Sequence, residues 1–344
     1  MSDSELERRI KYYNEDYEQE FGTSCNHFVC PILFKDEDVE MCRAHIINDA
    51  LRTSSKWVPQ RKDIDNFYGS AIEADFVGGM EHIGRDAREL FLDSKSRLNL
   101  KPKIEFQGKN VEYFFSKGDA PVVAGQTIVN VTNGAEVTIS QFNLKIPTET
   151  LLAADRRAIT LVIEKDYRPW IVAAVLKAAH LTLFDMMGYH HVRSSTGTLL
   201  ASILRQFYED VGGEHAVADQ VVKKYFSPHE AMISPLFVKD EGALRGSAED
   251  NLFLVCYTAN DVPFILGVIV RVKRHRFCVF LPTDQGIDTY YGFLKNPPQS
   301  VRARLARFLP ATATTGSAWE IDTEDMRLPL GQVLPENWPA SFSE

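Results

Sequence analysis

Hydrophobic and polar residues are spaced in two different ways along the chain, and the two patterns predict helices and strands in separate runs. Several segments combine the composition and spacing of helices. The segments predicted to be helical are residues 6–21, 41–51, 64–77, 81–96, 170–189, 198–211, 216–225 and 301–308. We expect the first, rich in charges, to be exposed and to pack weakly or contact a partner. We expect Gly78-Gly79 to end the third.

Two other regions carry short alternating or β-branched segments, which are typical of strands. The first spans residues 103–164, with Asn133-Gly134 as a turn, and the second spans residues 233–293, with Asn260-Asp261 as a hairpin turn. The sequence therefore predicts an α+β fold with mixed or antiparallel sheets and a helical layer.

The helix predicted at 170–189 is almost entirely apolar, and its polar exceptions admit two interpretations. Pro169 suits its first turn. Lys177 and His180 are three residues apart and share a face, so they would present a cation and an imidazole to a groove. The alternative is a Lys whose ammonium reaches the surface and a core His with satisfied hydrogen bonds. Ser194-Ser195-Thr196-Gly197 stands at the start of the helix predicted at 198–211. Ordinary N-capping explains these residues better than phosphate binding at the helix N-terminus.

Length and composition narrow the class of protein. The chain has 344 residues, which predicts two or three domains, and a formal net charge of −9, which argues against a general coat for nucleic acid. No apolar run reaches the length of a membrane span, and the N-terminus lacks the pattern of a signal peptide. Five cysteines, an odd number, fit a reducing compartment. We therefore expect a cytoplasmic protein without a membrane partner.

A cluster of three thiols and one imidazole near the N-terminus is a candidate zinc site. Its members are Cys25, His27, Cys30 and Cys42. They supply enough ligands for a structural, tetrahedral Zn²⁺, although their spacing differs from the two-residue knuckle typical of zinc sites. The alternative is that Cys30 and Cys42 are small buried hydrophobic residues. Cys256 and Cys278 lie in apolar, strand-like runs and are interpreted as core.

The segment that follows this cluster carries a recognisable arrangement of residues. Cys42-Arg-Ala-His45-Ile-Ile-Asn48 precedes Asp65-Asn66-Phe-Tyr-Gly69. This resembles the HNH (His-Me finger, treble-clef) endonucleases, particularly those in which a cysteine pair precedes Glu-His-Ile-Ile-Pro and a second pair opens Cys-x-x-Cys-Asn-x-x-x-Gly. The resemblance implies a small treble-clef-like ββα module, with His45 as general base, Asn66 beside the metal and Gly69 as the turn glycine.

The chain also departs from the family pattern. Ala44 stands where the family has an acidic residue or His, Asn48 replaces the proline, and Lys62 and Asp65 occupy the positions of the second cysteine pair. If the site is catalytic, the resemblance implies one divalent cation, Mg²⁺ or Mn²⁺, to stabilise the leaving oxygen. Asp65, or alternatively Asp63, would supply an oxygen ligand.

Basic residues form candidate contacts for nucleic-acid phosphates. Arg61 and Lys62 lie beside the HNH-like loop, and the run Val270-Arg-Val-Lys-Arg-His-Arg276 is basic. If that run is one strand, alternation places Arg271 and Lys273 on one side and Arg274 and Arg276 on the other. The alternative is a solvated hairpin turn with charged edges.

The motifs leave two functions open. No dinucleotide fingerprint, phosphate loop, His-Glu-x-x-His or Gly-x-Ser-x-Gly occurs in the sequence. The leading hypothesis is an HNH-like nuclease, or a degenerate descendant that binds nucleic acid. The alternative is a non-enzymatic module that binds another protein and is stapled by the Cys/His cluster. The predicted segments are a charged helix (1–24), an HNH-like module (25–98), a β-rich segment (99–165), a helical segment (166–228) and a β-rich C-terminal segment (229–344).

Overall fold

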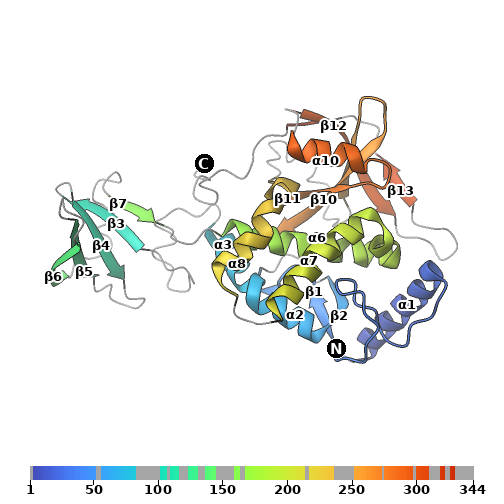
Figure 1. Ribbon diagram of the computed structural model, residues 1–344, viewed down its shortest axis with the longest axis horizontal. Coiled ribbons are helices and arrows are strands. Elements are labelled where there is room, and N and C mark those ends of the chain that lie inside the picture. Colours follow the sequence, from blue (N-terminus) through green and yellow to red (C-terminus); the bar gives the residue numbers. More distant parts are fainter. Residues whose placement is uncertain are drawn as a thin grey trace. The chain divides into compact units, whose positions relative to one another are not determined.

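The fold is α+β, as the pattern of the sequence predicts (Figure 1). The computed structural model describes residues 3–51, 56–82, 101–106, 109–115, 123–130, 136–144, 159–162, 167–213, 217–235, 252–272, 275–296, 300–309, 318–321 and 326–329. The chain divides into two compact units. The larger contains Met1–Val77 and Arg168–Trp338, and the smaller contains Gly78–Tyr167 and Pro339–Glu344. The predicted segments 1–24 and 166–228 therefore belong to one unit.

The smaller unit contains a five-stranded antiparallel sheet. Its strands are β3 (Lys101–Phe106), β4 (Lys109–Phe115), β5 (Val123–Asn130), β6 (Glu136–Leu144) and β7 (Ile159–Val162). They are ordered β6-β5-β4-β3-β7, and every pairing is antiparallel. The sheet predicted for residues 103–164 is thus confirmed, while the predicted Asn133-Gly134 turn lies outside the described residues.

The N-terminal part of the larger unit is a helix, a hairpin and a long interrupted helix. These elements are α1 (Asp3–Phe21), β1 (Met41–His45), the 3-10 turn η1 (Asp49–Leu51), β2 (Trp57–Arg61), α2 (Lys62–Tyr68), the π-helical turn η2 (Gly69–Glu73) and α3 (Ala74–His82). The helix predicted at 64–77 is confirmed, but it continues past Gly78-Gly79. A glycine at position 79 is explained by close packing, since an added Cβ would lie 2.9 Å from the Tyr167 side chain.

The helix predicted at 41–51 is wrong. Residues 41–45 form β1, which pairs antiparallel with β2. Its hydrogen-bonding partner lies about fifteen residues further along the chain, so local spacing does not reveal it.

The helix α1 is better integrated than its charge-rich sequence predicts. Tyr13 is 3% exposed and stacks on Phe184, with ring centroids 4.5 Å apart. Tyr17 meets Tyr189 edge to face, with centroids 5.0 Å apart. The expectation of a weakly packed helix is therefore wrong, because aromatic side chains of distant sequence segments cover its inner face.

A long apolar helix occupies the centre of the larger unit. The helices of this layer are α6 (Arg168–Arg193), α7 (Ser195–Val211), α8 (Asp219–Phe226) and the 3-10 turn η3 (Ser227–Met232). The α6 helix contacts α1, α7, α8, β2, β10 and β11. By length and hydropathy it would suffice to cross a membrane, but 78% of its most apolar window is buried inside the protein.

Two details at the C-terminal end of α6 depend on glycine and serine. Gly188 has a φ of 56°, which kinks α6, and the next backbone N–H, that of Tyr189, donates to Asp16 Oδ2 at 2.7 Å. The Ser194 side chain accepts a hydrogen bond from the Gly197 N–H at 3.1 Å. The predicted N-cap is therefore confirmed, and so are the helices predicted at 170–189, 198–211 and 216–225.

A seven-stranded antiparallel sheet completes the larger unit. Its strands are β8 (Ile233–Pro235), β9 (Leu252–Tyr257), β10 (Pro263–Val272), β11 (His275–Pro282), β12 (Ser300–Leu309), β13 (Ala318–Ile321) and β14 (Met326–Pro329). The order is β13-β12-β9-β10-β11-β8, and β14 also pairs with β12. The short helix α10 (Ile287–Lys295) packs on the sheet.

This sheet confirms some predictions and contradicts one. Cys256 and Cys278 are fully buried in its core, as expected, and β9 and β10 form the predicted hairpin around Asp261. The helix predicted at 301–308 is wrong, because these residues form β12. Val301 and Ala303 are buried while Arg302 is half-buried, an alternation that fits a strand paired on both sides.

Candidate functional site

The HNH-like residues lie on the hairpin β1–β2 and on the helix that follows it. Antiparallel pairing places His45 opposite Trp57 and Cys42 opposite Gln60. Side chains alternate along a strand, so His45 projects from one face of the hairpin and Cys42 from the other. We call the face with His45 and Trp57 the outer face, and the face with Cys42 and Gln60 the inner face.

The inner face is built on a buried lysine. Lys177 of α6 is 1% exposed, and its Nζ lies 2.6 Å from Glu73 Oε1 and 3.6 Å from Asp65 Oδ1. Glu73 is in the π-helical turn η2, and its other oxygen accepts a hydrogen bond from Asn48 Nδ2 at 2.8 Å. Asp65 also hydrogen-bonds the Cys42 thiol. These five residues form one connected network, which we call the Lys177 network.

Electrostatics keep the Lys177 ammonium charged. Burial alone would lower its pKa, but the opposite charges of Glu73 and Asp65 outweigh burial and raise the pKa above its ordinary value. The ring of Tyr68 lies 5.7 Å from Nζ and adds a cation–π contact. Lys177 thus fits neither of its predicted interpretations: its ammonium is fully internal and paired. His180, in contrast, is the satisfied core His of the second interpretation, with Nε2 3.0 Å from the Pro31 carbonyl oxygen.

The outer face gathers cations around an aromatic ring. The guanidinium groups of Arg9 and Arg43 lie 4.4 and 4.8 Å from the centroid of the Trp57 ring. Arg9 comes from α1 and also donates to the Trp57 carbonyl oxygen. Arg9 Nη1 lies 3.3 Å from Asp185 Oδ1, and Arg43 Nη1 lies 3.7 Å from Glu5 Oε2. The side chains of Arg9 and Arg43 keep exposed fractions of 33% and 25%.

The remaining predicted catalytic residue, Asn66, is exposed on α2. Its backbone oxygen accepts a hydrogen bond from the Ser70 hydroxyl at 2.8 Å. Among the residues that the structure describes, no hydrogen bond joins His45 to Asn66 or to Asp65. The structure therefore brings Asp65 together with Cys42 and Lys177, and not with His45.

The two basic residues beside the loop are engaged by carboxylates. Arg61 is 7% exposed, donates to both oxygens of Asp63 at 3.1 and 2.8 Å, and is also paired with Glu37. Lys62 lies 2.6 Å from Glu40. The hydrogen-bond donors that the sequence suggests for phosphate are thus directed largely at acidic groups of the same chain.

The four candidate zinc ligands have separate partners. The thiol of Cys30 donates to Gln60 Oε1 at 3.0 Å, Cys42 contacts Asp65, and His27 Nδ1 lies 3.1 Å from Asp36. Cys25 is half-buried. Within the described ranges, no group of three His, Cys, Asp or Glu side chains is arranged to hold a metal ion. Structural zinc remains a prediction from the sequence.

Different burial of the cysteines gives a direct test of this arrangement. Burial raises the pKa of Cys30 to about 11 and is also the largest cause that raises the pKa of Cys42, to about 12. In native protein at pH 8, we expect iodoacetamide to modify Cys25 first and to leave Cys30, Cys256 and Cys278 unmodified, because the thiolate is the reactive form. Peptide mass spectrometry measures the order. Protection of Cys25 that a chelator removes would instead indicate bound zinc.

The C-terminal basic run folds as a hairpin, which is the alternative interpretation of its sequence. Strand β10 ends at Val272 and β11 begins at His275, with Arg271 paired to Arg276. The predicted alternation along a single strand is therefore wrong, because the chain reverses within the run. Arg271 is exposed, and Lys273 and Arg274 lie outside the described residues.

Comparisons with known proteins add no further identification. No protein-family model matches the chain, and no curated protein or solved structure is significantly similar to it. The resemblance to HNH endonucleases therefore rests on the motif residues alone.

Four members of the site were not predicted from the sequence. They are Glu73, which is 104 residues before its partner Lys177, and Arg9, Arg43 and Trp57 of the outer face. The signal for Lys177 was a charged residue in an otherwise apolar helix, which requires a buried counter-charge. Nothing in the local sequence identifies which carboxylate supplies it.

Proposed function

We propose that this chain is a divergent HNH-like protein that binds nucleic acid on the outer face of its hairpin and no longer hydrolyses it. One observation carries the proposal. His45 lies on the outer face, whereas Asp65, the carboxylate that would hold the metal, lies on the inner face and is paired with Lys177. A general base and a metal ligand on opposite faces do not act on one phosphodiester bond.

The described residues do not fit a catalytic divalent cation at this module. Mg²⁺ requires oxygen ligands, and the carboxylates of Asp65 and Glu73 are already paired with the Lys177 ammonium. Ala44, at the position where the family has an acidic residue or a His, is fully buried and has no polar side-chain atom. The order of elements, a hairpin followed directly by α2, is nevertheless that of a ββα module. This combination favours a retained scaffold with a lost reaction.

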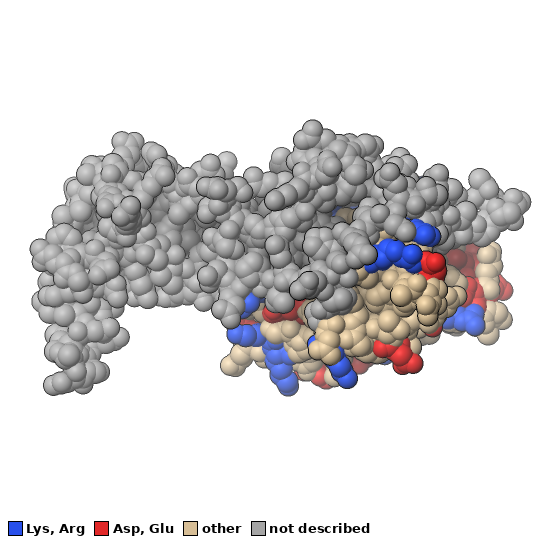
Figure 2. Space-filling model, turned by 90° about the horizontal axis from the view of Figure 1, so that it is seen from above, with Lys and Arg blue, Asp and Glu red and all other residues tan. Residues whose placement is uncertain are grey.

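The outer face has the chemistry of a nucleic-acid contact. Aromatic rings stack on bases, and arginine side chains bind phosphates and stack on rings themselves. Trp57, Arg9 and Arg43 supply both functions within one small area. Among the described residues that Figure 2 colours, basic and acidic side chains are interspersed. An acidic protein with mixed charges binds nucleic acid only where such residues are concentrated, so the proposed site is local.

Replacement of Arg43 with alanine should weaken binding of nucleic acid of any sequence. We expect a loss of roughly three- to tenfold in affinity and a decrease of about one in the slope of log K against log salt, because one phosphate contact is lost. Fluorescence anisotropy with labelled single-stranded DNA, single-stranded RNA and duplex DNA measures both quantities. Arg193→Ala is the matched control, since Arg193 is an exposed arginine paired with Glu20.

Two results would contradict the proposal. Equal affinity of wild type and Arg43→Ala for all three probes would exclude the outer face as the site. Cleavage that requires Mg²⁺ or Mn²⁺ and disappears in His45→Ala would establish an active nuclease instead.

The second candidate is a protein-interaction module. It is favoured by the net charge of −9 and by the carboxylate pairing of Arg61 and Lys62, which reduces the positive charge available to phosphates. Failure of all three probes to bind at low salt would support it. One zinc per chain, measured by elemental analysis of purified protein, would add the predicted Cys/His staple.

A further inference from the structure

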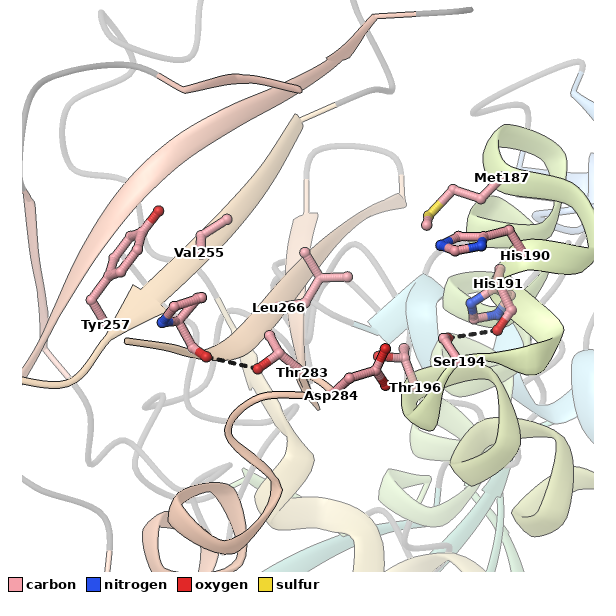
Figure 3. A pocket seen from close by; sticks show the side chains of 11 residues that line it. Met187, His190, His191, Ser194, Thr196, Val255, Tyr257, Leu266, Thr283 and Asp284 are labelled. Atoms are coloured by element: carbon pink, nitrogen blue, oxygen red, sulfur yellow. Dashed lines mark hydrogen bonds between the residues drawn. The ribbon is translucent and has the colours of Figure 1, made fainter. Parts of the chain in front are cut away.

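A cavity of about 320 Å³ lies between the end of α6, the start of α7 and the large sheet (Figure 3). Met187, Val255 and Leu266 form much of its apolar wall. Val255 and Leu266 are directly opposite each other on β9 and β10, so both project from the same face of the sheet. Their neighbours Cys256 and Ile265 belong to the core on the other face. The cavity is therefore part of the packed architecture and not a gap between loops.

His191 lies in one wall of this cavity, and its tautomer follows from its contact with His180. A carbonyl oxygen only accepts hydrogen bonds, so His180 Nε2, which is 3.0 Å from the Pro31 oxygen, carries a proton. The other ring nitrogen of His180 then accepts from His191 Nε2, which lies 3.0 Å away. Burial, reinforced by His180 and His190, holds the pKa of His191 well below its ordinary value. His191 is therefore neutral near pH 7, with its lone pair on Nδ1.

That lone pair has no partner among the described residues. His191 has a relative exposure of 1%, and it lines the cavity. This acceptor is available to a donor from outside the chain, either water or a ligand.

A carboxylate completes the polar part of the cavity. Asp284 Oδ1 accepts from the Ser195 N–H at 2.9 Å, and hydrogen bonds from Ser195 lower the pKa of Asp284. A carboxylate has further lone pairs beyond those used by Ser195. Figure 3 shows Asp284, Ser194 and His191 on one side of the cavity, with Tyr257 and Val255 on the other.

The charges near the cavity differ between its two ends, and the end with Asp284 and His191 is the acidic one. No lysine or arginine is among the described residues that line it. His190 Nδ1 lies 3.5 Å from Glu20 Oε1. Arg302 and Arg304 of β12 lie directly opposite Tyr257 and Val255, so both project from the same face of the sheet as the cavity, and Arg302 is paired with Asp261. Their guanidinium groups lie 5.7 and 5.1 Å from the centroid of the Tyr257 ring. The polar end therefore offers acceptors and a negative charge.

We propose that this cavity binds a small organic cation whose N–H groups donate to His191 Nδ1 and Asp284 and whose apolar body contacts Met187, Val255 and Leu266. An amidinium or a protonated heterocyclic amine has these properties. The site is separate from the hairpin face proposed to bind nucleic acid, so each proposal is tested independently of the other.

Benzamidine and benzoate are suitable probes, because they have similar shapes and opposite charges. We expect saturable, one-to-one binding of benzamidine and no binding of benzoate in isothermal titration calorimetry. In protein labelled with ¹⁵N-histidine, benzamidine should shift the Nδ1 resonance of His191 and leave that of the exposed His27 unchanged. This second readout reports the hydrogen bond itself and not the general stability of the fold.

Two variants test the assigned contacts. Asp284→Asn keeps an acceptor for the Ser195 N–H but removes the charge, and it should weaken benzamidine about three- to tenfold, as expected for a partly exposed charge pair. Leu266→Trp should fill the cavity and abolish binding. Asp288→Asn, an exposed aspartate of α10, is the matched control and should bind as wild type does. Equal binding of benzoate and benzamidine, an unchanged His191 resonance, or unaltered affinity in Leu266→Trp would each overturn the proposal.

Discussion

Replacement of Lys177 with methionine should lower the free energy of unfolding by about 3–5 kcal/mol, the cost of removing one partner from a buried ion pair. Methionine has a similar length and removes the ammonium alone. Glu73, whose side chain is 10% exposed, and Asp65 would then keep negative charges near each other without a cation. Urea denaturation followed by circular dichroism measures the loss.

The matched control is Lys62→Met. Lys62 forms an ion pair of the same length, 2.6 Å, but with the exposed Glu40, so solvent screens it and we expect almost no change in stability. The double variant Lys177→Met, Glu73→Gln removes opposite charges together and should recover part of the loss. A Lys177→Met protein as stable as Lys62→Met would show that the Lys177 network does not hold the hairpin against α6.

Replacement of His180 with glutamine should flatten the loss of stability that wild type shows on acidification. Burial lowers the pKa of His180 from 6.5 to about 4, so the folded state resists protonation. Below pH 6.5 the unfolded chain binds a proton that the folded chain does not, and stability falls until the pH reaches about 4. The contribution of this one group is about 3 kcal/mol over the window, at about 1.4 kcal/mol per pKa unit.

The comparison uses slopes and not absolute stabilities. Glutamine places an amide N–H near the position of His180 Nε2, so donation to the Pro31 carbonyl is retained while the titration is removed. The control is His190→Gln, because the His190 side chain is 67% exposed. Free energies of unfolding at pH 4, 5, 6 and 7 should give a shallower slope for His180→Gln and the wild-type slope for His190→Gln. Identical slopes for all three proteins would exclude His180 as the titrating group.

Both expectations concern buried polar residues of α6, whose partners the sequence does not identify. An apolar helix with Lys177 and His180 on one face predicts buried polar groups that need partners. The partners are Glu73, Asp65 and Pro31, which are more than a hundred residues away along the chain. Packing decides which of several acidic residues pairs with a lysine, because all carboxylates offer the same chemistry.

Local pattern was sufficient where the stabilising contacts are themselves local. The helices at 170–189 and 198–211 and the Ser194 cap were predicted correctly, because a helix satisfies its backbone within four residues. The strands of the smaller unit were also predicted, since alternation and β-branched residues favour a pleated surface. Apolar surroundings likewise identified Cys256 and Cys278 as core.

By itself, then, the sequence determined the α+β class, the central apolar helix and the core cysteines. Tertiary structure alone decided that residues 41–45 and 301–308 are strands, since each is stabilised by pairing with another strand. It also decided which motif residues share a face: alternation along β1 separates His45 from Cys42, and α2 brings Asp65 to Cys42 and Lys177. A motif fixes the spacing of its residues along the chain, but the direction of each side chain depends on strand pairing, which no local pattern encodes.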